Sequence, residues 1–307
     1  MYDIIGDVHG HLLELEGLLK NLGYKKYDDY YRHKNRKAIF LGDLIDRGPA
    51  QEGVVNLVRT MVKQGAAMAV MGNHEYNAIA YYTADTAGNY LRKRNEKNTA
   101  QHQKFLDVYQ DRPSDWHEVI TWFKTLPLWL DLTEFRIVHA CWDQTYINKI
   151  LAIYDNGATL SEEFLRRSSN EETWEFKAIE TILKGPELPL PGGVSFRDKE
   201  GQKRYSMRTQ WWKSASTYKE GYIGPEVARA SIPDVPIDED YAVGYGVKEK
   251  PVFIGHYWLS GVPEALAKNV VCVDYSVARP SGKLVAYRWQ ENTSIDASGF
   301  TSFEKVG

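Results

Sequence analysis

The chain has 307 residues, of which 43% are hydrophobic and 26% charged, and its formal net charge is −3. A chain of this length can bury most of its apolar surface without stabilising disulfides or metal ions. The small net charge gives no sign of a general polyanion-binding protein. The two cysteines, Cys141 and Cys272, form neither a disulfide framework nor a CxxC pair for a structural zinc ion.

The N-terminal sequence MYDIIGDVHG lacks the basic start, long apolar run and small-residue cleavage site of a signal peptide. No apolar segment approaches the length of a membrane span. We therefore expect a cytoplasmic protein in a reducing compartment, with no membrane partner. The sequence says nothing about the oligomeric state.

Five short apolar runs are each followed by a polar motif and are typical of buried strands. Three of them stop at a glycine that precedes Asp7, Asp43 or Asn73, while the other two lead to His139 and His256. In chain order, the runs are Tyr2–Ile5, Ala38–Leu41, Ala67–Met71, Phe135–Val138 and Val252–Ile254.

Helical patterns separate the first three runs. Leucines recur at helical spacing from Leu12 to Leu22 and stop at Gly23, and a second pattern covers Val54–Val62 and ends at Gly65. Alternating strands and helices predict an α/β fold with helices on the sheet faces. Ligands bind at the carboxyl ends of strands in such sheets, which is where all five polar motifs fall.

Beyond residue 141 the pattern changes. We expect residues 142–250 to form an insertion or cap, and residues 1–141 and 251–307 to form the catalytic core. Within the insertion, Val194–Phe196 and Arg204–Met207 predict a hairpin around residues 198–201. Near the C-terminus, Val270–Asp274 and Lys283–Trp289 flank a Pro-Ser-Gly turn and predict another hairpin, in a second antiparallel sheet or at a sheet edge.

The first two motifs, GDVHG and GDLIDRG, supply metal-ligand chemistry. Asp7 and His9 offer an oxygen and a nitrogen ligand for a borderline divalent metal, although His9 alone could equally begin a helix. Asp43 leaves a strand end and can bridge two metals. Asp46 could form a hydrogen bond behind the metal ligands, and the planar Arg47 suits a phosphate oxygen. Standing alone, this second motif would be a surface turn with an ion pair.

The third motif, GNHE, follows the Ala67–Met71 run. Asn73 offers a carbonyl oxygen to a metal, and His74 is better placed to donate a proton to a leaving group. Glu75 would orient His74 or begin the next helix, where a carboxylate is favourable. His139 and His256 are single histidines at strand ends, so each supports a metal site only in combination with the other motifs.

Together these motifs predict a two-metal centre. Two divalent ions about 3.5–4 Å apart need a bridging carboxylate, further oxygen and nitrogen ligands, and open positions for water. Manganese is the expected metal, but iron, zinc, nickel and cobalt fit the same donors. The six predicted ligands are Asp7, His9, Asp43, Asn73, His139 and His256.

The order GDVHG, GDLIDRG, GNHE, VHA, GH resembles the calcineurin-like metallophosphoesterase superfamily, in particular its phosphoprotein-phosphatase-like branch. Residues 1–75 look close to bacterial dinucleoside tetraphosphatases and serine/threonine-type phosphatases. The resemblance implies a four-layer α/β/β/α sandwich. It covers the catalytic core and not the insertion.

The resemblance also implies individual roles. One metal would take Asp7, His9 and Asp43, and the other would take Asp43 with the remaining three ligands. His74, assisted by Asp46, would be the general acid, and Arg47 would bind the phosphate. A second, downstream arginine would also bind phosphate, for which Arg208 is the candidate and Arg204 the competitor.

Departures from the family pattern shape the functional hypothesis. Gly255-His256-Tyr257-Trp258 lacks the second histidine of the GHxH motif found in phosphodiesterases, which favours phosphatase chemistry. It is also similar to the GHW of symmetrical dinucleoside tetraphosphatases. The fourth motif continues Ala140-Cys141-Trp142 instead of the usual Gly-Gly, which leaves the substrate open.

We therefore predict hydrolysis of phosphate monoesters, on a phosphoprotein or a small molecule, by metal-activated water. The alternative is hydrolysis of dinucleoside polyphosphates such as diadenosine tetraphosphate, with the aromatic-rich insertion stacking on adenine. Two further readings are disfavoured. No motif residue is lost, which argues against a non-catalytic scaffold, and the basic residues near Arg92 fit a solvated helix face better than nucleic-acid binding.

Overall fold

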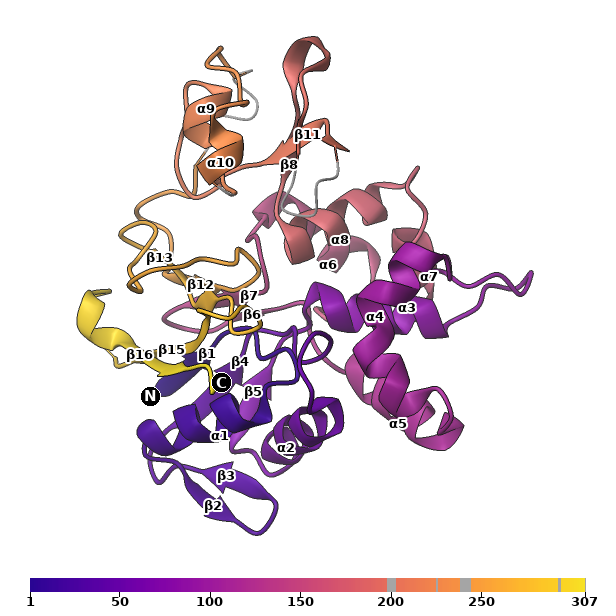
Figure 1. Ribbon diagram of the computed structural model, residues 1–307, viewed down its shortest axis with the longest axis vertical. Helices are drawn as coiled ribbons and strands as arrows, with labels where there is room; N and C mark the ends of the chain where they lie inside the picture. The colour runs from indigo at the N-terminus through magenta and orange to yellow at the C-terminus, as the bar shows by residue number, and fades with distance from the viewer. Residues whose placement is uncertain (198–202, 225, 238–243, 292–293, 307) are drawn as a thin grey trace.

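Two β-sheets lie face to face at the centre of the protein (Figure 1). The computed structural model describes residues 1–197, 203–224, 226–237, 244–291 and 294–306. The first sheet has the order β14-β15-β1-β4-β5, with β16 also paired to β15, and the second has the order β13-β12-β7-β6. The first sheet consists of β1 (Tyr2–Ile5), β4 (Lys37–Phe40), β5 (Ala67–Ala69), β14 (Asp274–Tyr275), β15 (Lys283–Trp289) and β16 (Phe300–Glu304). The second consists of β6 (Trp129–Asp131), β7 (Arg136–Val138), β12 (Val252–Ile254) and β13 (Val270–Cys272).

Parallel pairing brings the polar motifs to the same end of the molecule. In the first sheet β1 pairs parallel with β4, and β4 with β5. In the second sheet β12 pairs parallel with both β7 and β13. The five predicted strands are therefore present, but they divide between two sheets, three in the first and two in the second. The sequence pattern marks strand ends and carries no information on which sheet holds each strand.

The facing surfaces of the two sheets form one apolar core. Alternation of side chains along each strand turns Ile4 into this core, while its neighbour Ile5 packs against the helices outside. Phe253, on the central strand of the second sheet, is fully buried and has its ring 5.3 Å from that of Tyr287 and 5.7 Å from that of Trp289. These aromatic contacts fix how the sheets lie against each other.

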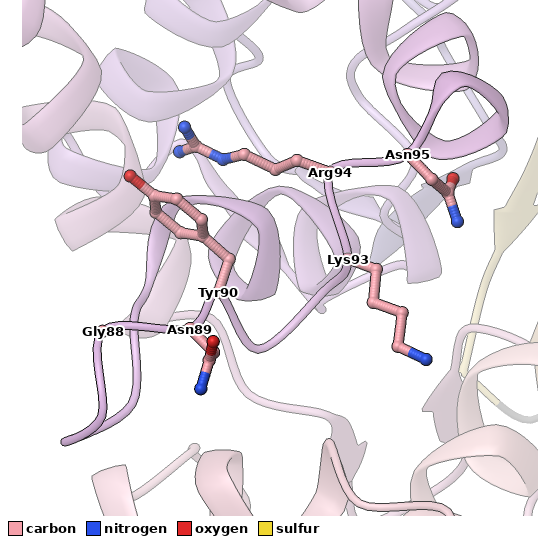
Figure 2. Close-up of a pocket in the computed structure, with 6 residues that line it drawn as sticks. All are labelled: Gly88, Asn89, Tyr90, Lys93, Arg94 and Asn95. Carbon is pink, nitrogen blue, oxygen red and sulfur yellow. The ribbon is translucent and has the colours of Figure 1, made fainter.

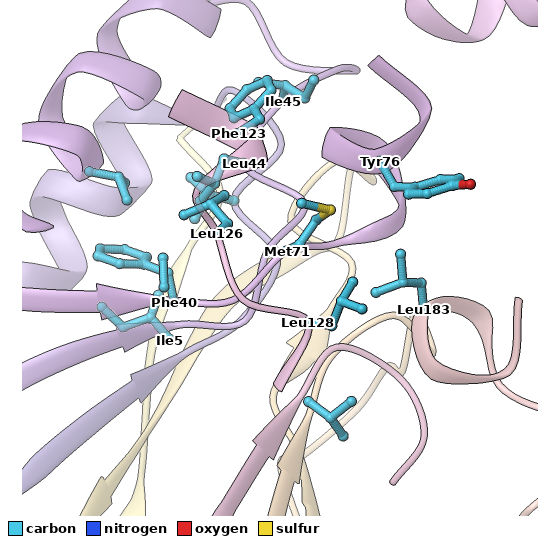
Figure 3. Close-up of a cluster of buried hydrophobic side chains, with 14 of the residues drawn as sticks. Ile5, Phe40, Leu44, Ile45, Met71, Tyr76, Phe123, Leu126, Leu128 and Leu183 are labelled. Atoms are coloured by element: carbon cyan, nitrogen blue, oxygen red, sulfur yellow. The ribbon is translucent and has the colours of Figure 1, made fainter. Parts of the chain in front are cut away.

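Helices cover both outer faces and complete the predicted four layers. On the first sheet, α1 (Leu12–Asn21) packs against β15 and β16, and α2 (Gln51–Lys63) packs against β5. Over the second sheet, α6 (Gln144–Ile153) and α8 (Trp174–Lys184) share an apolar cluster with β7 and β12. Beside these layers lie α3 (Asn73–Tyr82), α4 (Glu96–Tyr109) and α5 (Pro113–Lys124). Figure 3 shows part of the cluster beneath them, including Phe40, Met71 and Phe123.

Residues 187–232 have a small apolar core of their own, which includes Leu188, Met207 and Tyr222. The strands are β8 (Glu187–Pro189), β9 (Phe196–Arg197), β10 (Lys203–Arg204) and β11 (Ser206–Arg208), and the helices are α9 (Tyr218–Gly221) and α10 (Glu226–Arg229). Figure 1 shows this part at the top, beyond α8 and opposite to α1 and α2. The helix α7 (Glu162–Ser168) packs on α8. The division of the chain at residues 141 and 251 stays a prediction.

The hairpin predicted within the insertion is only partly right. Arg204 in β10 pairs antiparallel with Phe196 in β9, but Ser206 and Met207 of the predicted second strand lie in β11 and pair with β8. The predicted turn, residues 198–201, lies outside the described residues.

The hairpin predicted near the C-terminus is only partly right. Asp274 and Tyr275 in β14 pair with β15, but β13 pairs parallel with β12 in the other sheet. The run is apolar on both faces because it passes from one sheet to the other, so its pattern could not specify a single partner.

No helix in the described ranges is both long and apolar enough to cross a membrane. The remaining strands, β2 (Lys25–Tyr27) and β3 (Tyr30–Arg32), form a separate hairpin between α1 and β4.

The inter-sheet core predicts a large stability loss for Phe253→Ala. Removing this fully buried ring leaves a cavity between the sheets, and Phe→Ala changes in cores cost about 3–5 kcal/mol. Urea unfolding measures the change. The control is Val262→Ala, whose side chain is 84% exposed and whose loss should stay within about 0.5 kcal/mol. Equal effects for the two variants would contradict the proposed role of this core.

Candidate metal centre at the ends of both sheets

The carboxylate of Asp43 lies at the centre of the converging motifs. Its Oδ2 is 3.7 Å from Nε2 of His9 and 3.8 Å from Nε2 of His74. Its Oδ1 is 3.4 Å from Nε2 of His139. Asp43 follows β4 of the first sheet and His139 follows β7 of the second, so this carboxylate is where the two sheets' motifs meet.

Two groups of side chains have donor atoms close enough to hold a metal ion. One contains His9, Asp43 and His74, and the other contains Asp43, His139 and His256. Asp43 belongs to both, as expected of a bridging ligand. Nε2 of His9 and Nε2 of His256 are buried and have no hydrogen-bond partner among the described residues. A bound cation would satisfy such buried nitrogens, so the donor set fits two adjacent divalent ions.

Asn73 and Asp7 lie beside these groups. The Oδ1 atom of Asn73 is 3.1 Å from Nε2 of His139 and 2.8 Å from Nδ1 of His256, so it faces the second group. Asp7 belongs to neither group, and its carboxylate accepts the backbone N–H of His256 at 3.2 Å. Gly255 permits this approach, because a Cβ there would lie 2.2 Å from Oδ1 of Asp7.

Backbone carbonyls orient the imidazoles. Nδ1 of His9 donates to the carbonyl of Ile45 at 2.8 Å, and Nδ1 of His139 donates to that of Leu41 at 2.6 Å. In each case the other nitrogen, Nε2, is left facing Asp43. A carbonyl partner on the far nitrogen is the usual way in which a protein fixes the tautomer of a metal-binding histidine.

The electrostatics of the site favour the ionised form of Asp43. Burial raises its pKa, but the imidazoles of His139 and His74 outweigh burial, and the net pKa lies well below its ordinary value. Burial lowers the pKa of His139, but Asp43 reverses this and raises it to about 10. Asp7 behaves differently, because burial and the nearby Asp274 raise its pKa well above the ordinary value.

The loops that carry these residues adopt left-handed backbone conformations. Among the described residues other than glycine, all those with positive φ except Asp28 lie at this site or next to it: His9, Asp43, Asp46, Arg47, His256, Trp258 and Ser276. Their φ values run from 46° to 69°, a region that side chains with a Cβ rarely occupy. Strain of this kind persists only where the surroundings enforce it, and it gathers at functional sites.

Glu75 enforces the geometry of the Asp43 loop. Its carboxylate is fully buried and accepts the backbone N–H groups of Asp43 at 2.8 Å, Leu44 at 2.8 Å and Gly72 at 3.0 Å. The expectation that Glu75 orients His74 is therefore wrong. The alternative, a place at the start of the next helix, is right, since Glu75 lies in the first turn of α3.

Asp46 instead orients His74, as predicted. Its Oδ2 atom accepts a hydrogen bond from Nδ1 of His74 at 2.6 Å, and its Oδ1 atom accepts one from Nδ1 of His102 at 2.9 Å. His102 lies on α4 and is buried, with its ring stacked on that of Phe105 at 4.6 Å. Sequence reasoning gave His102 no role, because it stands outside every motif and 56 residues from Asp46 in the chain.

Arginines lie on two sides of the centre. Nη2 of Arg47 is 3.5 Å from Nε2 of His74, and its side chain is exposed. Arg208, at the end of β11, is half-buried and close enough to lower the pKa of His256, second only to burial. Arg204, its competitor in the sequence, is exposed on β10.

The fold and the motif geometry can now be compared with known proteins. The profile of the calcineurin-like phosphoesterase family matches residues 2–241. This chain belongs to the calcineurin-like metallophosphoesterase family. The match begins with β1 and runs through all but the last of the five motifs.

Bacterial relatives are bis(5'-nucleosyl)-tetraphosphatases named PrpE, of the asymmetrical type. The protein of Oceanobacillus iheyensis is 36% identical over 141 residues, which cover 45% of this chain and 54% of that protein. That of Anoxybacillus flavithermus is 48% identical over 75 residues, covering 24% of this chain and 31% of that protein. That of Bacillus cereus strain Q1 is 31% identical over 194 residues, which cover 60% of this chain and 77% of that protein. The chain thus spans about a third to a half of the first two relatives' length.

Solved structures share the fold over the whole chain at low sequence identity. A cold-active protein-tyrosine phosphatase of a psychrophilic Shewanella is 18% identical with a TM-score of 0.53, covering 99% of this chain and 79% of that one. A Saccharomyces cerevisiae serine/threonine phosphatase is 13% identical with a TM-score of 0.52, and the match covers 100% of this chain and 80% of that one. At such identities the likeness supports the four-layer fold alone.

The three bonds to Glu75 predict that Glu75→Ala destabilises the protein by about 3 kcal/mol or more, because each buried donor left unpaired costs about 1–3 kcal/mol. Denaturant unfolding in the presence of a chelator measures this without a contribution from metal binding. Glu75→Gln keeps one carbonyl oxygen as an acceptor and should lose less. A loss below about 1 kcal/mol in Glu75→Ala would show that these bonds do not hold the loop.

Proposed function

We propose that the protein hydrolyses dinucleoside polyphosphates at a binuclear metal centre. The observation that carries the reaction type is the sharing of Asp43 between two metal-binding groups, next to the His74–Asp46 pair. The substrate class is drawn from the relatives, which are named as bis(5'-nucleosyl)-tetraphosphatases. This reverses the order of the two hypotheses that the sequence motifs alone favoured.

In this proposal Asp7 replaces His74 in the first group, so that His74 is free to transfer a proton. Asp7, His9 and Asp43 would then hold one ion, and Asp43, Asn73, His139 and His256 would hold the other. Such a pair of ions, when bound, polarises the phosphoryl group and lowers the pKa of a water molecule. Manganese, iron, zinc, nickel and cobalt all suit the nitrogen and oxygen donors.

His74 is the proposed general acid. Burial lowers its pKa, but the charge of Asp43 and the hydrogen bond that His74 donates to Asp46 outweigh this, and the net pKa is raised. The raised pKa favours the protonated form of the ring. Because Asp46 takes Nδ1, that proton is delivered from Nε2, the atom that faces Arg47.

Arg47 and Arg208 are the proposed phosphate contacts. Arg47 extends from the motif loop next to Nε2 of His74, on the side where the leaving group would lie. Arg208 approaches His256 from β11, so it would face the same phosphate from the insertion. Arg204 is the weaker candidate because it is exposed on β10.

A substrate panel tests the proposed function. Purified protein with added Mn²⁺ should cleave diadenosine tetraphosphate with a higher kcat/KM than p-nitrophenyl phosphate, and a chelator should abolish both reactions. Faster turnover of the aryl phosphate would return the monoesterase hypothesis to first place. No metal-dependent turnover on either substrate would refute phosphoesterase activity.

The general-acid proposal predicts a dependence on the leaving group. Asp46→Asn should lower kcat for phenyl phosphate, whose leaving group needs a proton, by about 10²–10⁴-fold, the usual contribution of general acid–base catalysis. The loss for p-nitrophenyl phosphate should be smaller, because its leaving group departs without full protonation. Equal losses for both esters would show that Asp46 acts on folding or metal binding and not through His74.

A further inference from the structure

We propose that Arg279, which contacts the ring of Trp258 at the rim of the metal centre, binds phosphate groups of the substrate beyond the one that is cleaved. The proposal deepens the proposed function and rests on it, because only a substrate with a chain of phosphates would reach both Arg47 and Arg279. Nothing in the sequence motifs marks Arg279, which precedes the Pro-Ser-Gly turn before β15.

Trp258 lies at the rim of the metal centre. It stands two residues beyond His256, and its ring centroid is 6.1 Å from that of His9. Its backbone has a φ of 55°, a conformation that a tryptophan rarely adopts. The buried carboxylate of Asp274 accepts its N–H at 2.7 Å and so holds it in this conformation.

The same carboxylate fixes the segment that carries Arg279. Asp274 also accepts the N–H of Ser276 at 2.9 Å, and Ser276 has a φ of 59°. The carbonyl of Ser276 in turn accepts the N–H of Arg279 at 2.8 Å. The buried carboxylate of Asp274 therefore fixes the backbone next to both Trp258 and Arg279. The sequence did not reveal this role, because Asp274 appeared there only as the end of a predicted strand.

Two guanidinium groups converge on this indole. The Cζ atom of Arg47 is 3.8 Å from the ring centroid of Trp258, and that of Arg279 is 5.0 Å away. Within the described part of the chain, neither arginine has a carboxylate within ion-pair distance. Two like charges around one ring repel each other, and a cation–π contact at an exposed site offsets only about 0.5–1 kcal/mol. A multiply charged anion lying across the rim would neutralise both.

The presence of two arginines at one indole, only one of them next to His74, points to an anion with more than one phosphate group. Arg47 also lies next to His74, so a single phosphate group at the metal centre is within its reach. Arg279 contacts the same indole but comes from a different element, the connection between β14 and β15. A chain of phosphates can extend from the metal centre to Arg279, and guanidinium groups bind phosphate oxygens in a bidentate manner. A phosphate monoester has no group to place there.

A second stacked arginine provides a control. The open pocket between α3 and α4 is lined by Gly88, Asn89, Tyr90, Lys93, Arg94 and Asn95. Figure 2 shows Arg94 extending beside the ring of Tyr90, with its Cζ atom 3.3 Å from the ring centroid. Its guanidinium donates to the carbonyl of Tyr81. Arg94 thus matches Arg279 in chemistry but belongs to another part of the surface.

The test uses inorganic phosphates as inhibitors of p-nitrophenyl phosphate hydrolysis by the Mn²⁺-loaded full chain at a fixed free Mn²⁺ concentration. Arg279→Gln should raise the inhibition constant of tripolyphosphate about tenfold, the loss expected from one charge-assisted contact, and that of orthophosphate less than about twofold. Arg279→Lys should keep part of the affinity for tripolyphosphate. Arg94→Gln should change neither constant.

Trp258 variants test the ring itself. Trp258→Phe keeps an aromatic face and should retain the preference for tripolyphosphate over orthophosphate, whereas Trp258→Leu should reduce it. The proposal is overturned if Arg279→Gln changes both inhibition constants equally or changes neither.

Diadenosine tetraphosphate separates this inference from the proposed function. Arg279→Gln should lower kcat/KM for it about tenfold relative to kcat/KM for the aryl phosphate. If wild type prefers the aryl ester while Arg279→Gln still weakens tripolyphosphate selectively, the proposed substrate is wrong and the phosphate subsite stands. If wild type prefers diadenosine tetraphosphate and the variant keeps that preference in full, the subsite is wrong and the proposed function stands.

Discussion

The placement of one buried carboxylate, that of Asp43, determines the rest of the site. Both candidate metal groups include it, and imidazoles from both sheets point at it. An unpaired carboxylate in this position would be costly, and the site balances it with nearby imidazoles that lower its pKa. The Asp43 loop is strained, and Glu75 keeps it in place through three backbone hydrogen bonds. The two-sheet core matters for function because it fixes where His139 and His256 stand relative to Asp43.

The sequence predicted the architecture well where the signal is local. Apolar runs that stop at Gly-Asp or Gly-Asn located the ends of β1, β4 and β5, and leucine spacing located α1. It did not predict how the strands divide between two sheets, because a run buried on both faces has no alternation to show its partner. For the same reason the Val270–Asp274 run was assigned to one hairpin, although it contributes to both sheets.

For the site, too, the sequence could propose only the residues whose signal is local. Motif residues such as Asp43 and Asn73 could be proposed because their neighbours in sequence are informative. Partners that come from distant segments could not. His102 shares the carboxylate of Asp46, and Asp274 holds Trp258, but neither belongs to a dense motif. Their roles depend on hydrogen bonds across the fold, which only the structure displays, as do the left-handed conformations that concentrate around them.

Anomalous diffraction tests the central claim most directly. Crystals grown with Mn²⁺ and measured near its absorption edge should show two anomalous peaks about 3.5–4 Å apart, one on each side of the Asp43 carboxylate. The first should adjoin His9 and the second should adjoin His139 and His256. A single peak, or peaks that do not share Asp43 as a ligand, would contradict a binuclear centre built on this carboxylate.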